Sequence, residues 1–183
     1  MEIHKTCTFF GHRNTDCTEY LKQKVKSVVT DLIVEHGVTH FLFGSRSSFV
    51  SLCLEVVTEI KTNYPYIRRI AYTCRHETCT LECEKETWLK RYSYANNNFR
   101  LQTVDEEILY PHREKTSKSS YIQRNFAMID ASNYCVFYYN DQYKPPKRKL
   151  NKRSLSTYQP NSGTKLAYNY AMRKNVVIIN VKE

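Results

Sequence analysis

The sequence predicts an α/β protein with a Rossmann-like, three-layer fold and a mostly parallel central sheet. Short apolar and β-branched runs alternate along the chain with segments whose apolar residues recur at helical spacing, which is typical of a sheet wrapped by helices. The strand-like runs are apolar throughout, as expected where both faces of a sheet are covered. A length of 183 residues suits one domain, so we expect a single domain over residues 1–183.

Strands are predicted from runs of apolar, β-branched or aromatic residues that end at polar or glycine-containing loops. These runs lie at residues 6–10, 40–43, 67–73, 107–110, 134–139 and 176–181. Helices are predicted where apolar residues recur every three or four positions, at residues 19–35, 49–62, 84–93, 119–131 and 163–174. Gly37 is expected to stop the first helix, and Ser119 or Ser120 to cap the fourth.

The net charge of +10 is concentrated in one segment. Residues 144–153 hold six Lys and Arg side chains and no acidic residue, so the remainder of the chain carries only +4. We interpret residues 141–160 as a basic loop inserted between a strand and the last helix. It is either a solvated loop or an arm that closes on a polyanionic ligand or contacts nucleic acid through Lys144 to Arg153.

Seven scattered cysteines, an odd number, favour reduced thiols over a disulfide framework. The chain shows no signal peptide and no apolar stretch near the roughly 20 residues that a membrane span needs. We therefore expect a cytoplasmic protein that does not bind membranes. Cys74, His76, Cys79 and Cys83 are zinc-ligand types close together in the sequence, but their spacing matches no closed structural site, so we predict no metal and no cofactor.

Three loops that follow strands and precede helices are candidates for ligand binding. They lie at residues 11–14, 44–48 and 160–164, and each combines glycine with hydroxyl, amide or guanidinium groups. In an open parallel sheet such loops gather at the carboxyl edge, and the helix starts beside them offer free N–H groups that favour phosphate. Short polar loops of this kind also join strands to helices in any α/β protein, so the pattern alone does not establish a site.

Four stretches of the chain resemble the motifs of one protein family, in that family's order. Residues 7–13 resemble its opening C-x-F-T-G-H-R, and residues 41–49 lie where it has a Gly-Gly turn. Residues 124–132 are close to its R-N-x-x-M-V-D-x-S, and residues 162–171 resemble its G-G-T-x-x-x-x-x-Y-A. The chain is thus similar to the YpsA-like branch of the SLOG superfamily, which also contains the LOG phosphoribohydrolases and the DNA-processing protein DprA.

The resemblance implies a pocket for a nucleotide or nucleotide-derived ligand, such as ADP-ribose or a nucleoside phosphate, in a sensor or regulatory protein. Arginine forks, helix-start N–H groups and an amide are suited to phosphates and to base or ribose edges. The ligand-binding residues we expect are Gly11, His12, Arg13, Gly44, Ser45, Arg46, Ser48, Arg124, Asn125, Asn140, Ser162, Gly163 and Thr164. Self-association as a homo-oligomer is a further expectation from the family.

Two departures from the family pattern keep other functions open. Ser45 and Ser48 stand where the family has glycines, and Lys165, Leu166 and Ala167 follow the Gly-Thr pair where LOG enzymes carry a Glu. Hydrolysis of a nucleotide or N-glycoside would then depend on Glu55, a weak catalytic candidate, so whether the protein is an enzyme stays open. The second alternative is DprA-like binding of nucleic acid through the basic loop.

Overall fold

A computed structural model describes residues 4–44, 47–74, 104–110, 118–145 and 161–182. The strands are β1 (Lys5–Gly11), β2 (Val38–Phe43), β3 (Arg68–Thr73), β4 (Glu106–Leu109), β5 (Tyr134–Tyr138) and β6 (Val177–Asn180). The helices are α1 (Glu19–Val34), α2 (Ser48–Ile60), α5 (Lys118–Asp130) and α6 (Gly163–Ala171). Every predicted strand is therefore confirmed to within two residues at each end, as are three of the helices.

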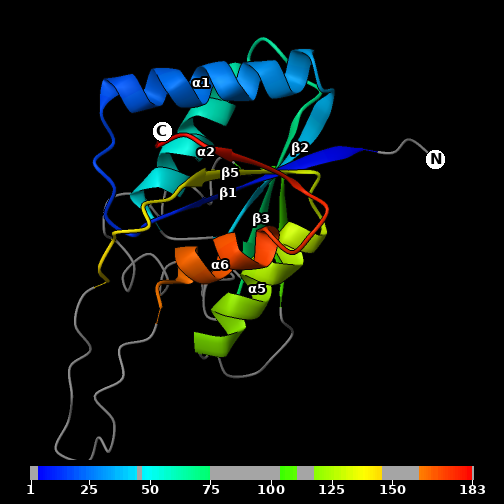
Figure 1. Ribbon diagram of the computed structural model, residues 1–183. Coiled ribbons are helices and arrows are strands. Elements are labelled where there is room, and N and C mark those ends of the chain that lie inside the picture. The colour runs from blue at the N-terminus through cyan, green and yellow to red at the C-terminus, as the bar shows by residue number, and fades with distance from the viewer. Residues whose placement is uncertain (1–3, 45–46, 75–103, 111–117, 146–160, 183) are drawn as a thin grey trace, which may run out of the picture.

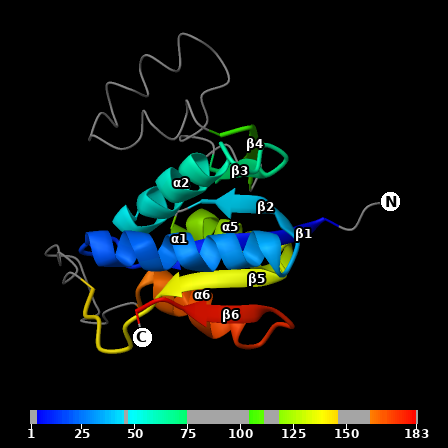
Figure 2. The ribbon, with the colours of Figure 1, turned by 90° about the horizontal axis from the view of Figure 1, so that it is seen from above.

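The six described strands form one sheet in the order β4-β3-β2-β1-β5-β6, and every neighbouring pair is parallel (Figure 2). The predicted Rossmann-like α/β fold is confirmed. From β1 the chain first adds β2, β3 and β4 on one side, and then adds β5 and β6 on the other. The order therefore reverses between β1 and β5, and in open α/β sheets the crevice at such a switch point is where ligands bind.

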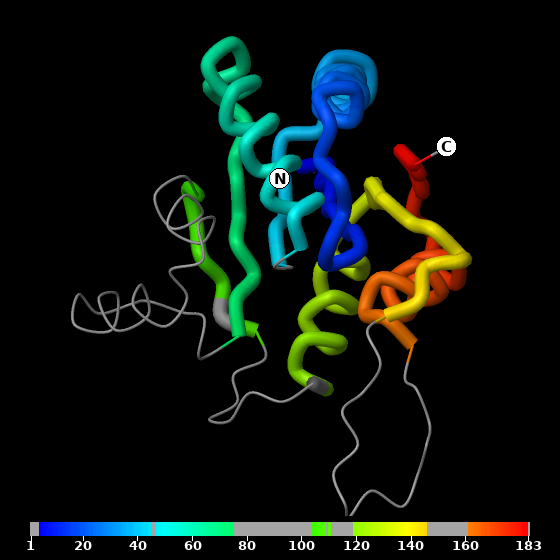
Figure 3. The backbone as a smooth tube through the Cα atoms, turned by 90° about the vertical axis from the view of Figure 1, so that its left-hand side faces the viewer, coloured from blue at the N-terminus to red at the C-terminus, as the bar shows by residue number. Residues whose placement is uncertain are grey.

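Helices cover both faces of the sheet, with α1 and α2 on one face and α5 and α6 on the other (Figures 1 and 3). Consecutive residues of β1 supply both cores, because side chains along a strand alternate between its faces. Phe9 lies in the cluster that includes Leu32 and Val57 of α1 and α2. Phe10 lies in the cluster that includes Met128 of α5 and Ala167 of α6. This two-sided burial explains why the strand-like runs are apolar without alternation.

The helix ends follow local capping chemistry. The hydroxyl of Thr18 caps α1 by accepting the N–H of Leu21, and Gly37 beyond the helix adopts a φ of 67° that favours glycine. The last helix is shorter than predicted, because the N–H groups of Arg173 and Lys174 bond to carbonyls three residues back and tighten the chain into a turn.

One predicted cap is wrong, and some predictions lie outside the described residues. Helix α5 begins at Lys118, so Ser119 and Ser120 lie within its first turn and do not precede it. The predicted helix at residues 84–93 and most of the basic loop, residues 146–160, lie outside the described part of the chain.

Candidate functional site

Strand β1 ends at Gly11, at the switch point of the sheet. The start of helix α2 packs so closely on Gly11 that no side chain would fit there. A Cβ atom at Gly11 would lie 2.6 Å from Cβ of Phe49, in the first turn of α2. Gly11 pairs in register with Tyr138 at the end of β5. Glycine at this position therefore lets the start of α2 pack directly on the carboxyl end of β1.

The first and second loops are joined by hydrogen bonds around Ser48. The N–H of Ser48 donates to the carbonyl of Arg13 at 3.1 Å. Its hydroxyl accepts the N–H of Thr15 at 2.8 Å and lies 2.9 Å from the Thr15 carbonyl, to which it donates. Ser47 caps α2 by accepting the N–H of Val50 at 3.1 Å. Ser48 was predicted to bind ligand, and in the structure its hydroxyl holds the first loop in place. The other two predicted residues of the second loop, Ser45 and Arg46, lie outside the described residues.

The third loop is joined to the first at the start of α6. The hydroxyl of Thr164, which is buried, donates to the carbonyl of Gly11 at 2.8 Å. Ser162 caps α6 by accepting the N–H of Lys165 at 3.1 Å. The structure thus brings the predicted turn Ser162-Gly163-Thr164 to the carboxyl end of β1, beside the switch point. A Cβ added to Gly163 would meet none of the described residues within 4 Å, so these residues leave the space over this helix start open.

His12 bridges the switch point itself. Its side chain is 2% exposed, and its Nε2 accepts the N–H of Asn140, just beyond β5, at 3.0 Å. The imidazole stacks on the ring of Tyr143 with centroids 3.8 Å apart and lies 5.9 Å from the ring of Tyr139. Burial lowers the pKa of His12, so the imidazole is neutral at neutral pH. The two predicted residues His12 and Asn140 are therefore in direct contact, through the Asn140 main chain.

Arg124 of α5 lies at the neighbouring carboxyl ends of β2 and β3. It is 3% exposed, its Nη1 is 3.8 Å from Sγ of Cys74, and its guanidinium lies over the ring of Tyr121 at 5.3 Å. A Cβ atom at Gly44 would lie 3.0 Å from Nε of Arg124 and 2.3 Å from Sδ of Met128. Gly44 therefore permits the close approach of α5 to the end of β2. The Arg124 side chain is buried against this glycine.

Two other predicted residues differ in their exposure and pairing. Arg13 is exposed on the first loop, where its guanidinium is accessible to an anion. Glu55 is half exposed on α2 and its carboxylate binds Nζ of Lys22 at 2.6 Å. Lys22 also binds Glu59 at 2.7 Å, so Glu55 belongs to a three-residue ion-pair cluster between α1 and α2.

A polar and aromatic cluster beside β5 was missed by the sequence analysis. Asp141 accepts hydrogen bonds from the hydroxyl of Tyr139 at 2.9 Å and from Nζ of Lys165 at 3.3 Å. Burial and the neighbouring Asp141 raise the pKa of Tyr139 to about 12. Tyr139 also stacks on Tyr168 of α6 at 4.2 Å. The consecutive aromatic residues Phe137, Tyr138 and Tyr139 were a signal, but Asp141 and Tyr143 fell within the basic loop and were grouped with it.

Asn125, the residue after Arg124, has a side-chain oxygen that is buried without a hydrogen-bond partner among the described residues.

In the part of the chain that the structure describes, no group of three or more His, Cys, Asp or Glu side chains could hold a metal ion. His76, Cys79 and Cys83 lie outside that part. None of the described helices combines the length and apolar character needed to cross a membrane.

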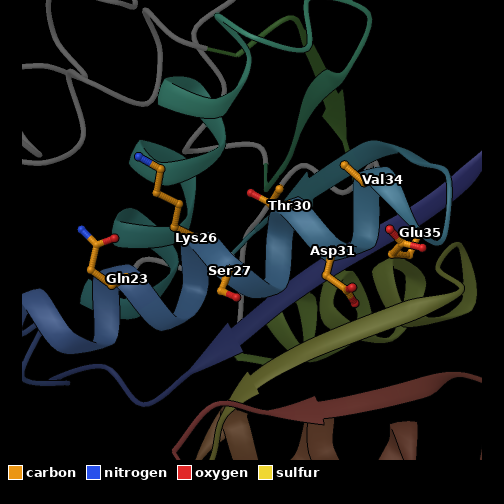
Figure 4. Close-up of a pocket in the computed structure, with 7 residues that line it drawn as sticks. All are labelled: Gln23, Lys26, Ser27, Thr30, Asp31, Val34 and Glu35. Carbon is orange, nitrogen blue, oxygen red and sulfur yellow. The ribbon is translucent and has the colours of Figure 1, made fainter.

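A separate hollow of about 500 Å³ runs along the outer face of α1 (Figure 4). All of the side chains that line it come from this helix and its C-cap residue: Gln23, Lys26, Ser27, Thr30, Asp31, Val34 and Glu35. It contains none of the predicted ligand-binding residues, and it is an open groove on a helix surface. The candidate site is instead the set of joined loops at the carboxyl edge.

Together the parallel sheet and the three joined loops define a Rossmann-like domain with a candidate site at its topological switch point. Residues 4–174 match the family model of YpsA, described as the YspA SLOG family. The chain therefore belongs to this SLOG family, as the motifs indicated, and the family implies a nucleotide-derived ligand. A search of the curated proteins found no match to the chain.

Proposed function

We propose that the protein binds a nucleotide or nucleotide-derived ligand, of the ADP-ribose or nucleoside phosphate kind, and acts as a sensor or regulatory protein. The observation that carries this proposal is the joining of the three candidate loops. Ser48 binds the first loop to the start of α2, and Thr164 binds the start of α6 to Gly11. Two helix N-termini with positive dipole ends therefore lie at the end of β1. Three of their N–H groups, those of Ser48, Val50 and Lys165, are already hydrogen-bonded within the protein.

The side chains at this edge suit the parts of such a ligand. Arg13 offers an exposed, planar fork of donors for a phosphate. The open space over Gly163 allows a ligand to approach the backbone of the α6 turn. Membership of the SLOG family supports a ligand of this class. The proposal assigns phosphate contact to Arg13 and to the Ser162-Gly163-Thr164 turn, and assigns positioning to Ser48.

The proposal is tested by the thermal unfolding of the full chain with ADP-ribose, nucleoside phosphates and dinucleotides. A ligand present at 100 times its Kd adds about 2.7 kcal/mol to the free energy of unfolding, since it binds only the folded state. For a chain of this size that corresponds to a rise in Tm of roughly 5–10 °C. A panel that leaves the Tm of the wild-type protein unchanged would contradict the proposal.

A matched pair of arginine substitutions locates the site. Arg13→Gln removes an exposed arginine at the carboxyl edge, and Arg68→Gln removes an exposed arginine at the start of β3, where it pairs with Glu106 at 3.3 Å. We expect the ligand-induced rise in Tm to shrink in Arg13→Gln and to persist in Arg68→Gln. Equal responses of the two variants would place the anion elsewhere on the protein.

The same incubations distinguish the alternative functions. A freed base or sugar phosphate in the chromatogram, absent in Glu55→Gln, would indicate a hydrolase; we place binding first because Lys22 already occupies the Glu55 carboxylate. A salt-dependent gel shift that is lost when Lys147, Arg148 and Lys149 are neutralised would indicate nucleic-acid binding. The proposal also includes a single domain over residues 1–183 and a homo-oligomeric state. It leaves the basic loop as either a solvated loop or an arm that contacts a polyanionic ligand or nucleic acid.

A further inference from the structure

The hydrogen bond between His12 and Asn140 determines where the imidazole carries its proton. Asn140 donates its main-chain N–H to Nε2 of His12 at 3.0 Å, and the acceptor in such a bond must present a lone pair. Nε2 is therefore unprotonated. Because the main-chain N–H of Asn140 cannot act as an acceptor, the other ring nitrogen, Nδ1, carries the hydrogen of the neutral imidazole.

This Nδ1–H group is a buried donor for which the described residues supply no acceptor. The Nδ1 atom has no hydrogen-bond partner and almost no exposed surface. A buried donor left unpaired costs about 1–3 kcal/mol, and buried polar groups in native proteins are nearly always paired. The chain thus holds a fixed, unsatisfied donor at the switch point of the sheet, 2% exposed, at the edge where the three candidate loops meet.

The groups that face His12 do not favour the protonated ring. Tyr143 and Tyr139 contribute aromatic faces from the segment after β5, and Lys182, after β6, contributes a positive charge. Asp141, which shares Tyr139 with this cluster, has a carboxylate occupied by the Tyr139 hydroxyl and by Lys165 of α6. Protonation at Nε2 would also direct that N–H toward the N–H of Asn140. The surroundings therefore select a neutral ring.

We propose that His12 recognises an acceptor oxygen of the bound ligand through Nδ1–H, as a neutral imidazole whose tautomer is set by the main chain of Asn140. This inference rests on the proposed function, since it names one contact of that same site. The acceptor is an oxygen of a phosphate or of a ribose. Because Nδ1 is closed off in the ligand-free protein, a neighbouring side chain shifts when the acceptor enters.

The inference predicts an unusual pH dependence of binding. A histidine that binds phosphate as a cation binds more tightly as the pH falls. Here protonation breaks the Asn140 contact and removes the selected tautomer, so affinity should fall as the pH falls and the protonated fraction of His12 rises. The His12→Asn variant accounts for ionisation of the ligand phosphates. A constant or rising affinity for ADP-ribose across the pH interval in which NMR shows His12 to become protonated would overturn the inference.

Two substitutions of His12 separate its two nitrogens. The amide nitrogen of Asn occupies the position of Nδ1 and preserves that donor, whereas the longer Gln places its amide near the position of Nε2. We expect His12→Asn to bind ADP-ribose within a few-fold of wild type. We expect His12→Gln to bind about tenfold to a hundredfold more weakly, as for loss of one hydrogen bond to a charged or polar partner. His40→Gln removes another partly buried histidine and should leave binding unchanged.

Nitrogen NMR on protein labelled in its histidines tests the tautomer without any substitution. The expected spectrum shows a protonated Nδ1 and an unprotonated Nε2 for His12, with the Nδ1 signal shifting when ADP-ribose is added. A protonated Nε2, or wild-type affinity in His12→Gln, would refute this inference and leave nucleotide binding intact. Absence of any ADP-ribose response in the wild type would instead count against the proposed function. Adenosine and inorganic pyrophosphate, added separately, identify whether ribose or phosphate oxygen shifts the Nδ1 signal.

Discussion

The two faces of the sheet differ in what they bury. The face covered by α1 and α2 is built from a large cluster of aliphatic and phenylalanine side chains, including Phe9, Leu32 and Val57. The face covered by α5 and α6 has a smaller apolar cluster, and its helices also bury Ser120, Arg124 and Thr164. Burial of apolar surface stabilises the folded state and requires no particular orientation of the groups. Buried polar groups, in contrast, destabilise the folded state unless they form hydrogen bonds with specific partners.

This difference indicates a division of labour within one sheet. Among the described residues, the α1 and α2 face supplies most of the apolar burial, which stabilises the fold. The α5 and α6 face carries Thr164, which joins α6 to Gly11, and the stacked pair Tyr139 and Tyr168. Substitutions on the first face should therefore act on stability, and substitutions on the second should act mainly on the candidate site.

The largest effect is expected from Leu32→Ala on the α1 face. Leu32 is fully buried, so truncation removes apolar contacts and leaves a cavity that costs about 2–5 kcal/mol. Chemical denaturation would measure this loss. Affinity for ADP-ribose, measured well below the Tm, should not change. A large loss of affinity in a variant that remains folded would contradict the division between the faces.

Gly11→Ala tests the close approach of α2 to β1. The added Cβ would lie 2.6 Å from Cβ of Phe49, which cannot move without its helix, so we expect a loss of about 1–3 kcal/mol. Gly163→Ala is the matched control, because its Cβ would meet nothing within 4 Å. The control should fold with wild-type stability. If Gly11→Ala were equally stable, the contact between the first loop and α2 would not constrain the site.

Thr164→Val tests the polar contact that holds the third loop. Valine keeps the shape of threonine but cannot donate to the carbonyl of Gly11, so we expect a loss of about 1 kcal/mol in stability. The same change should weaken ADP-ribose binding by a larger factor than Leu32→Ala does, because it frees the start of α6. Thr58→Val is a control for binding, since the Thr58 hydroxyl donates to a carbonyl within α2 and accepts from Arg69, both away from the third loop.

Asp105→Asn tests a polar contact that serves the α2 face. Partial burial would raise the pKa of Asp105, but hydrogen bonds and the charge of Arg69 hold it down at about 2. A lowered carboxyl pKa stabilises the fold at neutral pH, and that stability is lost as the pH falls through the interval from about 4 to 2. We expect Asp105→Asn to cost about 1 kcal/mol at pH 7, allowing for solvent screening, and progressively less as the pH falls to and below the folded pKa of about 2. Glu106→Gln, which alters an exposed pair, should have less effect at pH 7.

The smallest effect is expected in the pH dependence of stability due to His12. Burial lowers its pKa, so the folded protein binds fewer protons than the unfolded chain as the pH falls below about 6.5. Stability should therefore decline from pH 7 toward pH 5 and level off below the folded pKa. His12→Gln should flatten this slope. His40, whose pKa burial also lowers, contributes a slope of its own, which His40→Gln identifies. An unaltered slope in His12→Gln would show that the site face carries no buried, neutral histidine.

Local patterns in the sequence determined the elements and the class of fold. Phe9 and Phe10 are consecutive and both apolar, which indicated a strand buried on two faces, and Gly37 marked the end of α1 by its conformational freedom. The G-H-R and R-N motifs indicated the family because each is contiguous in the chain. These features depend on neighbours within a few residues, and such neighbours can be read without knowing the fold.

Only the tertiary structure decided how the site is assembled. His12 and Asn140 are 128 residues apart in the sequence, and their contact exists because β5 is inserted beside β1. The packing of α2 likewise places the Ser48 hydroxyl where it bonds to Thr15 of the first loop, and places Glu55 against Lys22 of α1. Residue types establish which hydrogen bonds a side chain is able to make. The partner it has depends on strand order and helix packing, which no local pattern specifies.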